Sequence, residues 1–104
     1  MGKVYLIESK TNGCVEYKIG ITSKNVATRL HQMQTGNPAT LKIISSYTTN
    51  NYIKLETILH NLYKRYNIRG EWFSDKINVD NFLADCEFND KLINSLKKGN
   101  NHFI

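Results

Sequence analysis

Asn12-Gly13, set between two runs of β-favouring residues, is the feature that most constrains how this chain folds. Residues 3–8 contain Val, Tyr, Leu and Ile, and residues 15–21 resume the same kind of pattern after a turn over residues 9–13. An Asn-Gly pair between two such runs is the strongest short-range signal for a β-hairpin, because both residues tolerate a positive φ. We therefore expect an antiparallel hairpin at the amino end.

A helix and a third strand are expected after the hairpin. Apolar residues recur at helical spacing at about residues 25–34, and Thr22 or Ser23 is placed to cap this helix. Residues 40–48 alternate and contain two isoleucines, which is typical of a strand. We expect this strand to join the hairpin in one sheet.

The longest helix is expected at about residues 52–66, capped by Asn50 or Asn51. Its predicted buried stripe consists of Leu55, Ile58, Leu59, Leu62 and Tyr66. A short extended segment, Glu71-Trp72-Phe73, follows Gly70 and is interpreted as a structural piece that packs back on the edge of the core.

Two short helices are expected to close the domain, at about residues 79–88 and 91–97, with Asp75 or Asn78 as the cap of the first. The polar residues 99–104 are expected to form a frayed tail. The predicted fold is therefore α+β, a small three-stranded antiparallel sheet flanked by helices, in a single domain over residues 1–98.

Composition narrows the class of protein without identifying it. A formal net charge of +5 and a pI of about 9.3 fit a polyanionic partner such as nucleic acid, because neutralisation of its phosphates supplies much of the affinity of a protein for nucleic acid.

No apolar run is long enough to span a membrane. The chain begins directly with a strand-like pattern, so we expect no secretory leader and a cytoplasmic location, that of a bacterial host if a phage encodes it. Cys14 and Cys86 lack metal-ligand spacing and are expected to be reduced.

Three residues of the hairpin could carry chemistry. Tyr5 lies in the first strand, and Lys18 and Gly20 share one face of the second, because side chains alternate along a strand. A glycine at a strand end leaves room for a ligand or another backbone to approach closely. The alternatives are a half-buried structural tyrosine and an exposed strand lysine.

The two predicted helices add an arginine, a glutamate and a histidine. Arg29 is the residue type best suited to clamp a phosphate through two hydrogen bonds. Glu56 and His60 are four residues apart, and are therefore neighbours at the border of the apolar stripe, where a carboxylate suits a metal ligand. A solvated helix arginine and an ordinary surface Glu–His pair remain the alternatives.

Taken together, these residues resemble the motifs of the GIY-YIG nuclease superfamily. The resemblance rests on Val4-Tyr5, Lys18-Ile19-Gly20, Arg29-Leu30, Leu55-Glu56 with His60, and Gly70-Glu71-Trp72-Phe73. It is closest to the branch associated with phages and large viruses, in which KIG often stands in place of YIG, and it covers about residues 3–75. The order and spacing of the motifs carry the resemblance, since no single motif is specific.

The resemblance implies roles for residues of this chain. Tyr5 matches the tyrosine that activates water as a general base, Glu56 the single carboxylate that holds one divalent ion, and Arg29 the arginine that steadies the scissile phosphate. His60 recurs in this branch and is expected to contact a phosphate or the leaving group. The expected substrate-binding residues are Gly20, Arg29 and, at the rim of the cleft, Arg69.

Two positions depart from the family pattern. Lys3-Val4-Tyr5 lacks the usual glycine and isoleucine but keeps the tyrosine. Lys18 replaces the tyrosine of the second motif, as in some restriction-enzyme members. Because the unperturbed pKa of tyrosine is about 10, an ammonium at Lys18 could favour the phenolate of Tyr5, or it could contact the phosphate instead.

The function implied by the resemblance is a metal-dependent endonuclease that hydrolyses phosphodiester bonds in DNA, with one Mg²⁺ or Mn²⁺ on Glu56. A homodimer would allow one small site to cut two strands. The alternative is a catalytically silent module of the same fold that binds DNA or a host protein, since a fold does not decide a function.

Overall fold

The hairpin at the amino end is present as predicted. The computed structural model describes residues 1–98 and pairs β1 (Gly2–Thr11) with β2 (Cys14–Thr22) in antiparallel register. Asn12 and Gly13 both have positive φ, 49° and 80°, as a type I′ turn requires. The turn therefore sets the register, on which the position of every side chain of the two strands depends.

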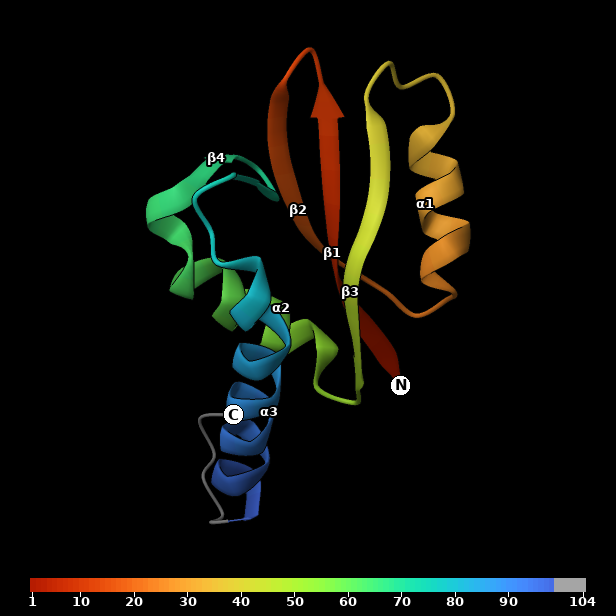
Figure 1. Cartoon of the computed structure of the whole chain (residues 1–104). Coiled ribbons are helices and arrows are strands. Elements are labelled where there is room, and N and C mark those ends of the chain that lie inside the picture. Colours follow the sequence, from red (N-terminus) through yellow and green to blue (C-terminus); the bar gives the residue numbers. More distant parts are fainter. Residues whose placement is uncertain (99–104) are drawn as a thin grey trace.

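The sheet has five strands, not the three that were predicted. β3 (Thr40–Thr49) pairs with the other edge of β1, while β5 (Trp72–Ser74) and β4 (Asn67–Arg69) extend the sheet beyond β2. The strand order is β3-β1-β2-β5-β4, antiparallel throughout (Figure 1). β4 and β5 contain three residues each, too few for an alternating pattern to be recognised, and the prediction was wrong for this reason. The α+β class itself is confirmed.

The first helix lies where it was predicted but has a different cap. α1 is Val26–Gln34, and the side chain of Asn25 accepts a hydrogen bond from the backbone N–H of Ala27 at 2.7 Å. The predicted caps precede it: Thr22 is the last residue of β2, and Ser23 lies in the connection that follows. Asparagine caps a helix as well as serine or threonine does, so spacing alone could not decide among the three.

The second helix, α2 (Tyr52–Leu62), is shorter than the predicted 52–66 and continues as a 3₁₀ turn over Lys64–Tyr66. Leu62, predicted to be buried, is 50 % exposed. The reason is that the buried positions follow a spacing of four, which leaves Leu62 on the neighbouring side; these positions are Leu55, Leu59 and Tyr63.

One helix closes the described part of the chain where two were predicted. α3 (Phe82–Lys98) has 17 residues and follows a 3₁₀ turn at Val79–Asn81. The predicted break at residues 88–91 is wrong because neither glycine nor proline interrupts the chain there. The side chain of Asn89 instead donates a hydrogen bond to the Asp85 carbonyl one turn earlier, at 2.8 Å.

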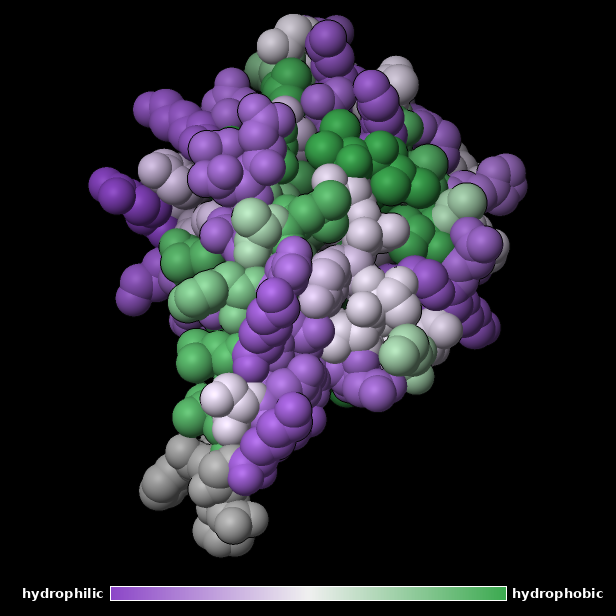
Figure 2. Space-filling view, turned by 60° about the horizontal axis from the view of Figure 1, so that its bottom comes forward, coloured by the Kyte–Doolittle hydropathy of each residue, from purple (hydrophilic) through white to green (hydrophobic). Residues whose placement is uncertain are grey.

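α3 projects away from the sheet (Figure 1). Figure 2 shows hydrophilic side chains along one side of this projecting part and hydrophobic ones along the other. The exposed apolar residues of α3 include Leu83, Phe88 and Leu92. None of the helices in the described part of the chain has the length and apolar character needed to cross a bilayer. The predicted frayed tail, residues 99–104, lies outside the described residues.

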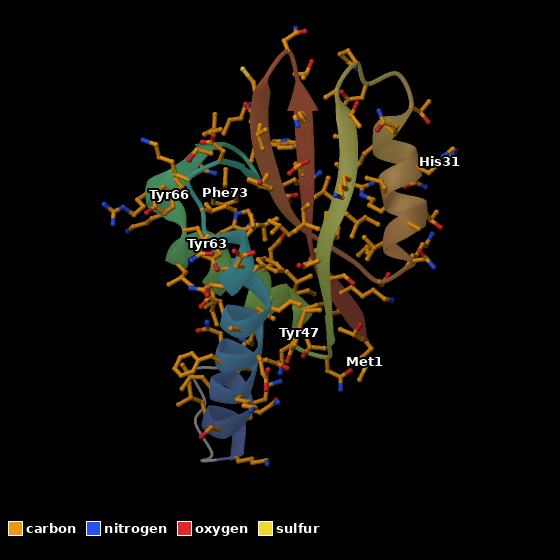
Figure 3. All side chains as sticks on the ribbon, viewed as in Figure 1. Met1, His31, Tyr47, Tyr63, Tyr66 and Phe73 are labelled. Atoms are coloured by element: carbon orange, nitrogen blue, oxygen red, sulfur yellow. The ribbon has the colours of Figure 1, made fainter. Side chains whose placement is uncertain are left out.

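The core lies on both faces of the sheet. On one face, buried residues of the strands pack against α2 and α3. The strand residues include Val4, Leu6, Ile19 and Phe73, and those of α2 include Leu55 and Leu59. On the opposite face, α1 covers a smaller cluster formed by Tyr5, Ile7, Val26, Ala39 and Leu41. Successive residues of β1 therefore alternate between the two clusters, as the two-residue period of a strand requires. His31 lies on the side of α1 turned away from the sheet (Figure 3).

A polar network ties α3 to the end of β3. The Asp90 carboxylate accepts hydrogen bonds from the Tyr47 hydroxyl at 2.9 Å, the Thr49 hydroxyl at 2.7 Å and the Asn51 amide at 2.7 Å (Figure 3 labels Tyr47). Asn51 stands at the predicted cap position of α2, but its side chain is used in this network and makes no capping bond. Burial acts to raise the pKa of Asp90, yet these hydrogen bonds outweigh it and hold the pKa below its ordinary value of 3.8.

We expect Asp90→Asn to lower the free energy of unfolding by about 1–3 kcal/mol at neutral pH, because three donors lose a charged acceptor. A pKa lowered by folding means that the carboxylate stabilises the fold above its unfolded pKa and loses this effect as the pH falls through the folded pKa. The free energies of unfolding of the parent and the variant should therefore approach each other as the pH falls below about 4, and converge only below the folded pKa of Asp90. Urea unfolding across this range measures both effects.

The matched control is Asp75→Asn, which removes the same charge from an exposed position. Its free energy of unfolding should stay within about 0.5 kcal/mol of the parent value at neutral pH. Equal losses in the two variants would show that net charge, and not the Asp90 network, sets the stability.

Candidate functional site

Tyr5 and Gly20 are direct partners in the hairpin register. A Cβ built on Gly20 would stand 2.5 Å from the Tyr5 hydroxyl oxygen and 2.6 Å from its ring carbon Cζ. The Tyr5 side chain is only 1 % exposed, so it has little room to move aside. The close approach that this glycine permits is therefore that of the Tyr5 ring, which lies across the Gly20 backbone.

Arg29 brings positive charge to the Tyr5 hydroxyl from α1, the helix that covers this face of the sheet. Burial raises the pKa of Tyr5, whereas the nearby guanidinium of Arg29 lowers it. The carboxylates of Glu71 and Glu56 act in the same direction as burial. Arg29 is thus a cation that favours the phenolate, and the residue is exposed to solvent.

α2 places Glu56 and His60 against the edge of β2. β5 pairs only with Glu16–Lys18, so the next carbonyl of β2, that of Ile19, accepts a hydrogen bond from His60 Nε2 at 2.9 Å. Since a carbonyl can only accept, Nε2 of His60 carries a proton. Glu56 Oε2 lies 3.9 Å from the same nitrogen. The histidine thereby fixes the position of α2 beside the strand edge.

Glu56 has a buried oxygen without a partner. Its Oε2 is shielded from solvent and has no hydrogen-bond partner among residues 1–98, and the side chain is 17 % exposed. Burial raises the pKa of Glu56, the nearby charge of Glu71 raises it further, and His60 and Lys18 oppose them. An unsatisfied buried carboxylate oxygen is uncommon and calls for an explanation such as an ion.

The donor set at Glu56 fits a magnesium-like ion better than a zinc-like one. The described residues contain no group of three or more His, Cys, Asp or Glu side chains that could hold a metal ion together. Zinc sites in proteins take three or four such ligands, whereas Mg²⁺ is held by one or two carboxylates and completes its shell with waters and substrate phosphates. Glu56 could therefore serve as the protein ligand of such an ion.

Lys18 and Glu71 form an ion pair beside Glu56. Lys18 Nζ lies 3.7 Å from Glu71 Oε1, and the Lys18 side chain is 15 % exposed. The Glu71 backbone carbonyl accepts a hydrogen bond from the Ile19 N–H at 3.0 Å, which anchors the residue at the strand edge. The sequence interpretation treated Glu71 as structural and missed its carboxylate. The strand register could have revealed this carboxylate, because Trp72, the residue after Glu71, lies opposite Lys18. Using the register, however, requires β5 to be recognised, and β5 has only three residues.

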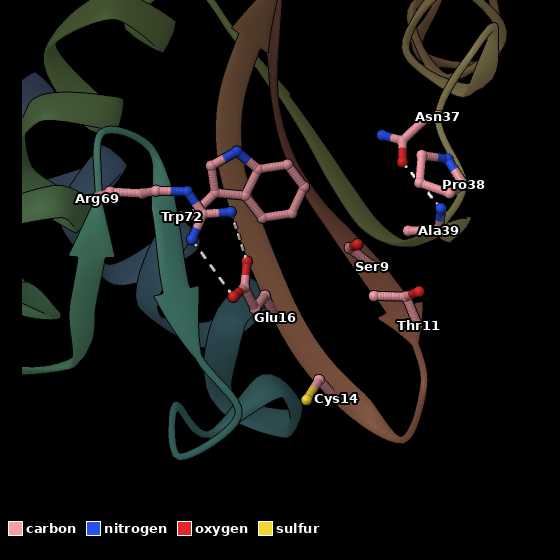
Figure 4. A pocket seen from close by; sticks show the side chains of 9 residues that line it. All are labelled: Ser9, Thr11, Cys14, Glu16, Asn37, Pro38, Ala39, Arg69 and Trp72. Carbon is pink, nitrogen blue, oxygen red and sulfur yellow. Dashed lines mark hydrogen bonds and ion pairs between the residues drawn. The ribbon is translucent and has the colours of Figure 1, made fainter.

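Arg69 lies apart from these residues, toward the hairpin end of β2. Its Nη2 is 2.9 Å from Glu16 Oε1, and its guanidinium lies 5.9 Å from the centre of the Trp72 ring (Figure 4). Glu16 precedes Gly20 by four residues, about 13 Å along a strand. The structure thus brings together most of the predicted residues and separates Arg69 from them; those brought together are Tyr5, Lys18, Gly20, Arg29, Glu56 and His60.

Comparison with known proteins supplies a family for this arrangement. Residues 2–88 match the T5orf172 domain, a stretch that runs from β1 into α3 and includes every residue of the candidate site. No curated protein and no solved structure shows significant similarity to the chain. Since the family match covers most of its length, this chain belongs to the T5orf172 domain family.

Proposed function

We propose that this protein is a metal-dependent endonuclease of the GIY-YIG type that hydrolyses phosphodiester bonds in DNA. Membership of the phage-associated T5orf172 domain family supports a nuclease-like, DNA-binding role. The observation that carries the proposal is the buried Oε2 of Glu56, which lacks a hydrogen-bond partner among residues 1–98 and lies near Lys18 and His60. Binding of DNA alone does not explain a buried carboxylate oxygen without a hydrogen-bond partner, whereas coordination of one divalent ion does explain it.

Glu56 would hold one Mg²⁺ or Mn²⁺, which when bound supplies a Lewis acid and stabilises the leaving oxygen. Lys18 and Arg29 add fixed positive charge around the scissile phosphate, from β2 and from α1 respectively. Arg29 is exposed, so the part of its guanidinium turned away from Tyr5 is open to a phosphate oxygen. A contact between His60 and the phosphate or leaving group remains a prediction.

Tyr5 accepts the proton of the attacking water in its phenolate form. The water oxygen bonds to phosphorus, its proton passes to the Tyr5 oxygen, and the bond from phosphorus to the leaving oxygen breaks; solvent then protonates the leaving oxygen. Because burial raises the pKa of Tyr5, the phenolate depends on the positive charge that Arg29 contributes. The base and the phosphate clamp are therefore coupled through one arginine.

A binding module without catalysis is the second candidate function. The observation in its favour is the burial of Tyr5, which is 1 % exposed and whose pKa is raised by that burial. Both properties oppose formation of a phenolate. The two candidates differ in whether cleavage depends on metal and on Glu56.

We expect Glu56→Ala and Tyr5→Phe each to reduce DNA cleavage at least about 100-fold, the lower bound for loss of a general base or of a metal ligand. Supercoiled plasmid and branched DNA, incubated with Mg²⁺, Mn²⁺ or EDTA, provide the measurement. Glu87→Ala is the matched control, since Glu87 is a 60 % exposed carboxylate on α3. Thermal unfolding should show that all three variants remain folded.

Full activity in either site variant would contradict the proposed roles. DNA binding without cleavage in every metal would favour the binding module. A protein that neither binds nor cuts DNA would direct attention to a protein partner.

The pH dependence of cleavage should report on Tyr5. Because the active form of a base is deprotonated, the rate is expected to rise with pH, and Arg29→Gln should move this rise to higher pH, since Arg29 lowers the pKa of Tyr5. Initial rates from about pH 6 to about pH 10 measure the shift. Lys24→Gln, which removes an exposed charge just before α1, should leave the profile in place. A uniform loss of rate in Arg29→Gln, without displacement of the profile, would assign the arginine to the phosphate alone.

A further inference from the structure

A pocket of about 370 Å³ lies beyond the candidate site, near Arg69. Figure 4 shows the Trp72 indole on one side of it and Asn37 and Pro38, from the loop between α1 and β3, on the other. Ser9 of β1 also lines it. Its volume falls in the range of pockets that hold small organic molecules.

The cation of this pocket is already neutralised. The Arg69 guanidinium pairs with the Glu16 carboxylate at 2.9 Å and lies 5.9 Å from the Trp72 ring centre. This arrangement holds the indole from one side without offering a free positive charge for a phosphate. A neutral, planar ligand suits these walls better than an anion does.

The opposite wall provides a fixed hydrogen-bond donor. The Oδ1 of Asn37 accepts a hydrogen bond from the Ala39 N–H at 2.9 Å, which sets the orientation of the amide (Figure 4). The NH₂ group of Asn37 is thereby presented on the pocket side of the loop. An asparagine amide held in this way is well suited to the acceptor atoms on the edge of a base.

We propose that this pocket binds one unpaired nucleobase of the substrate, stacked on Trp72 and hydrogen-bonded by Asn37. The proposal rests on the proposed function and specifies its substrate class. A base inside a duplex is stacked between its neighbours and cannot enter, so the substrate must present a single-stranded segment or end close to the cut. Base–aromatic stacking is the usual means by which proteins hold such segments.

The pocket and the candidate site lie along the same face of the sheet. Ser9 is four residues from Tyr5 on β1, which corresponds to about 13 Å. Trp72 lies opposite Lys18 in the β5–β2 register and packs with the cluster that contains Tyr5. A strand whose phosphate sits at Tyr5 therefore reaches the pocket within a few nucleotides.

The test uses the fluorescence of Trp72, the single tryptophan of the chain. Glu56→Ala protein in EDTA is titrated with three probes: a thymidine oligonucleotide of about twelve nucleotides, an abasic oligonucleotide of equal length, and a duplex of equal length. We expect the thymidine strand to quench the fluorescence, and the abasic strand and the duplex to leave it unchanged. Equal quenching by the abasic strand, or binding of the thymidine strand without any change at Trp72, would overturn the proposal.

Two variants locate the contact. Trp72→Leu should weaken binding of a labelled thymidine strand by about 5- to 100-fold, measured by fluorescence anisotropy. Asn37→Asp keeps the acceptor for Ala39 but replaces the NH₂ donor by a carboxylate, and should weaken binding at least several-fold while the melting temperature is kept. Phe88→Leu is the control, because Phe88 is a 68 % exposed aromatic residue on α3. Unchanged affinity in both pocket variants would refute the assignment.

Failure of this proposal and failure of the proposed function are distinguishable. Metal-dependent cleavage that requires Glu56, with Trp72 fluorescence unaffected by the thymidine strand, would support the endonuclease proposal and overturn the pocket proposal. Quenching by the thymidine strand without cleavage in any metal would support base binding in the pocket and overturn the endonuclease proposal. Absence of any binding in the anisotropy measurement would overturn the pocket as well.

Discussion

The packing of the Tyr5 ring on the bare backbone of Gly20 is the contact on which the whole site depends. It requires that the two residues be direct partners, and this pairing is set by the Asn12-Gly13 turn. A slip of one residue would carry the tyrosine to the face covered by α2, where Val4 and Leu6 now pack. The two-residue turn at the tip of the hairpin therefore determines whether the Tyr5 hydroxyl lies near Arg29 at the other end of the hairpin.

Charge in the site is balanced by residues from separate elements. Burial raises the pKa of both Tyr5 and Glu56, and it is opposed at Tyr5 by Arg29 of α1 and at Glu56 by His60 of α2 and Lys18 of β2. Glu71, which follows β4, acts in the same direction as burial on both groups. The protonation state of the site is thus a property of the assembled fold, because no single element contains both a titrating group and all of its partners.

The hairpin and the face of β2 that carries Lys18 and Gly20 could be predicted from the sequence, because turn chemistry and strand alternation are local signals. The Asp90 network could not, since Asn51 reads locally as a helix cap while its acceptor lies 39 residues away. Glu71 was missed for a related reason: a three-residue strand has no period of its own and is formed only when β2 is already present to pair with it. Long-range pairing leaves little local trace, and both omissions follow from this.

Arg69 shows why the identity of a residue is an incomplete guide to its chemistry. An arginine at the rim of a cleft suggests a phosphate contact, yet here its charge is matched by Glu16 and its guanidinium lies over an indole. Arg29, by contrast, is exposed beside a neutral hydroxyl and keeps its charge available. The sheet face is therefore cationic near Tyr5 and aromatic near Trp72. If both proposals hold, a nucleic-acid strand that follows this face meets the proposed phosphate site at one end and the proposed base pocket at the other, and this difference favours one polarity of the bound strand.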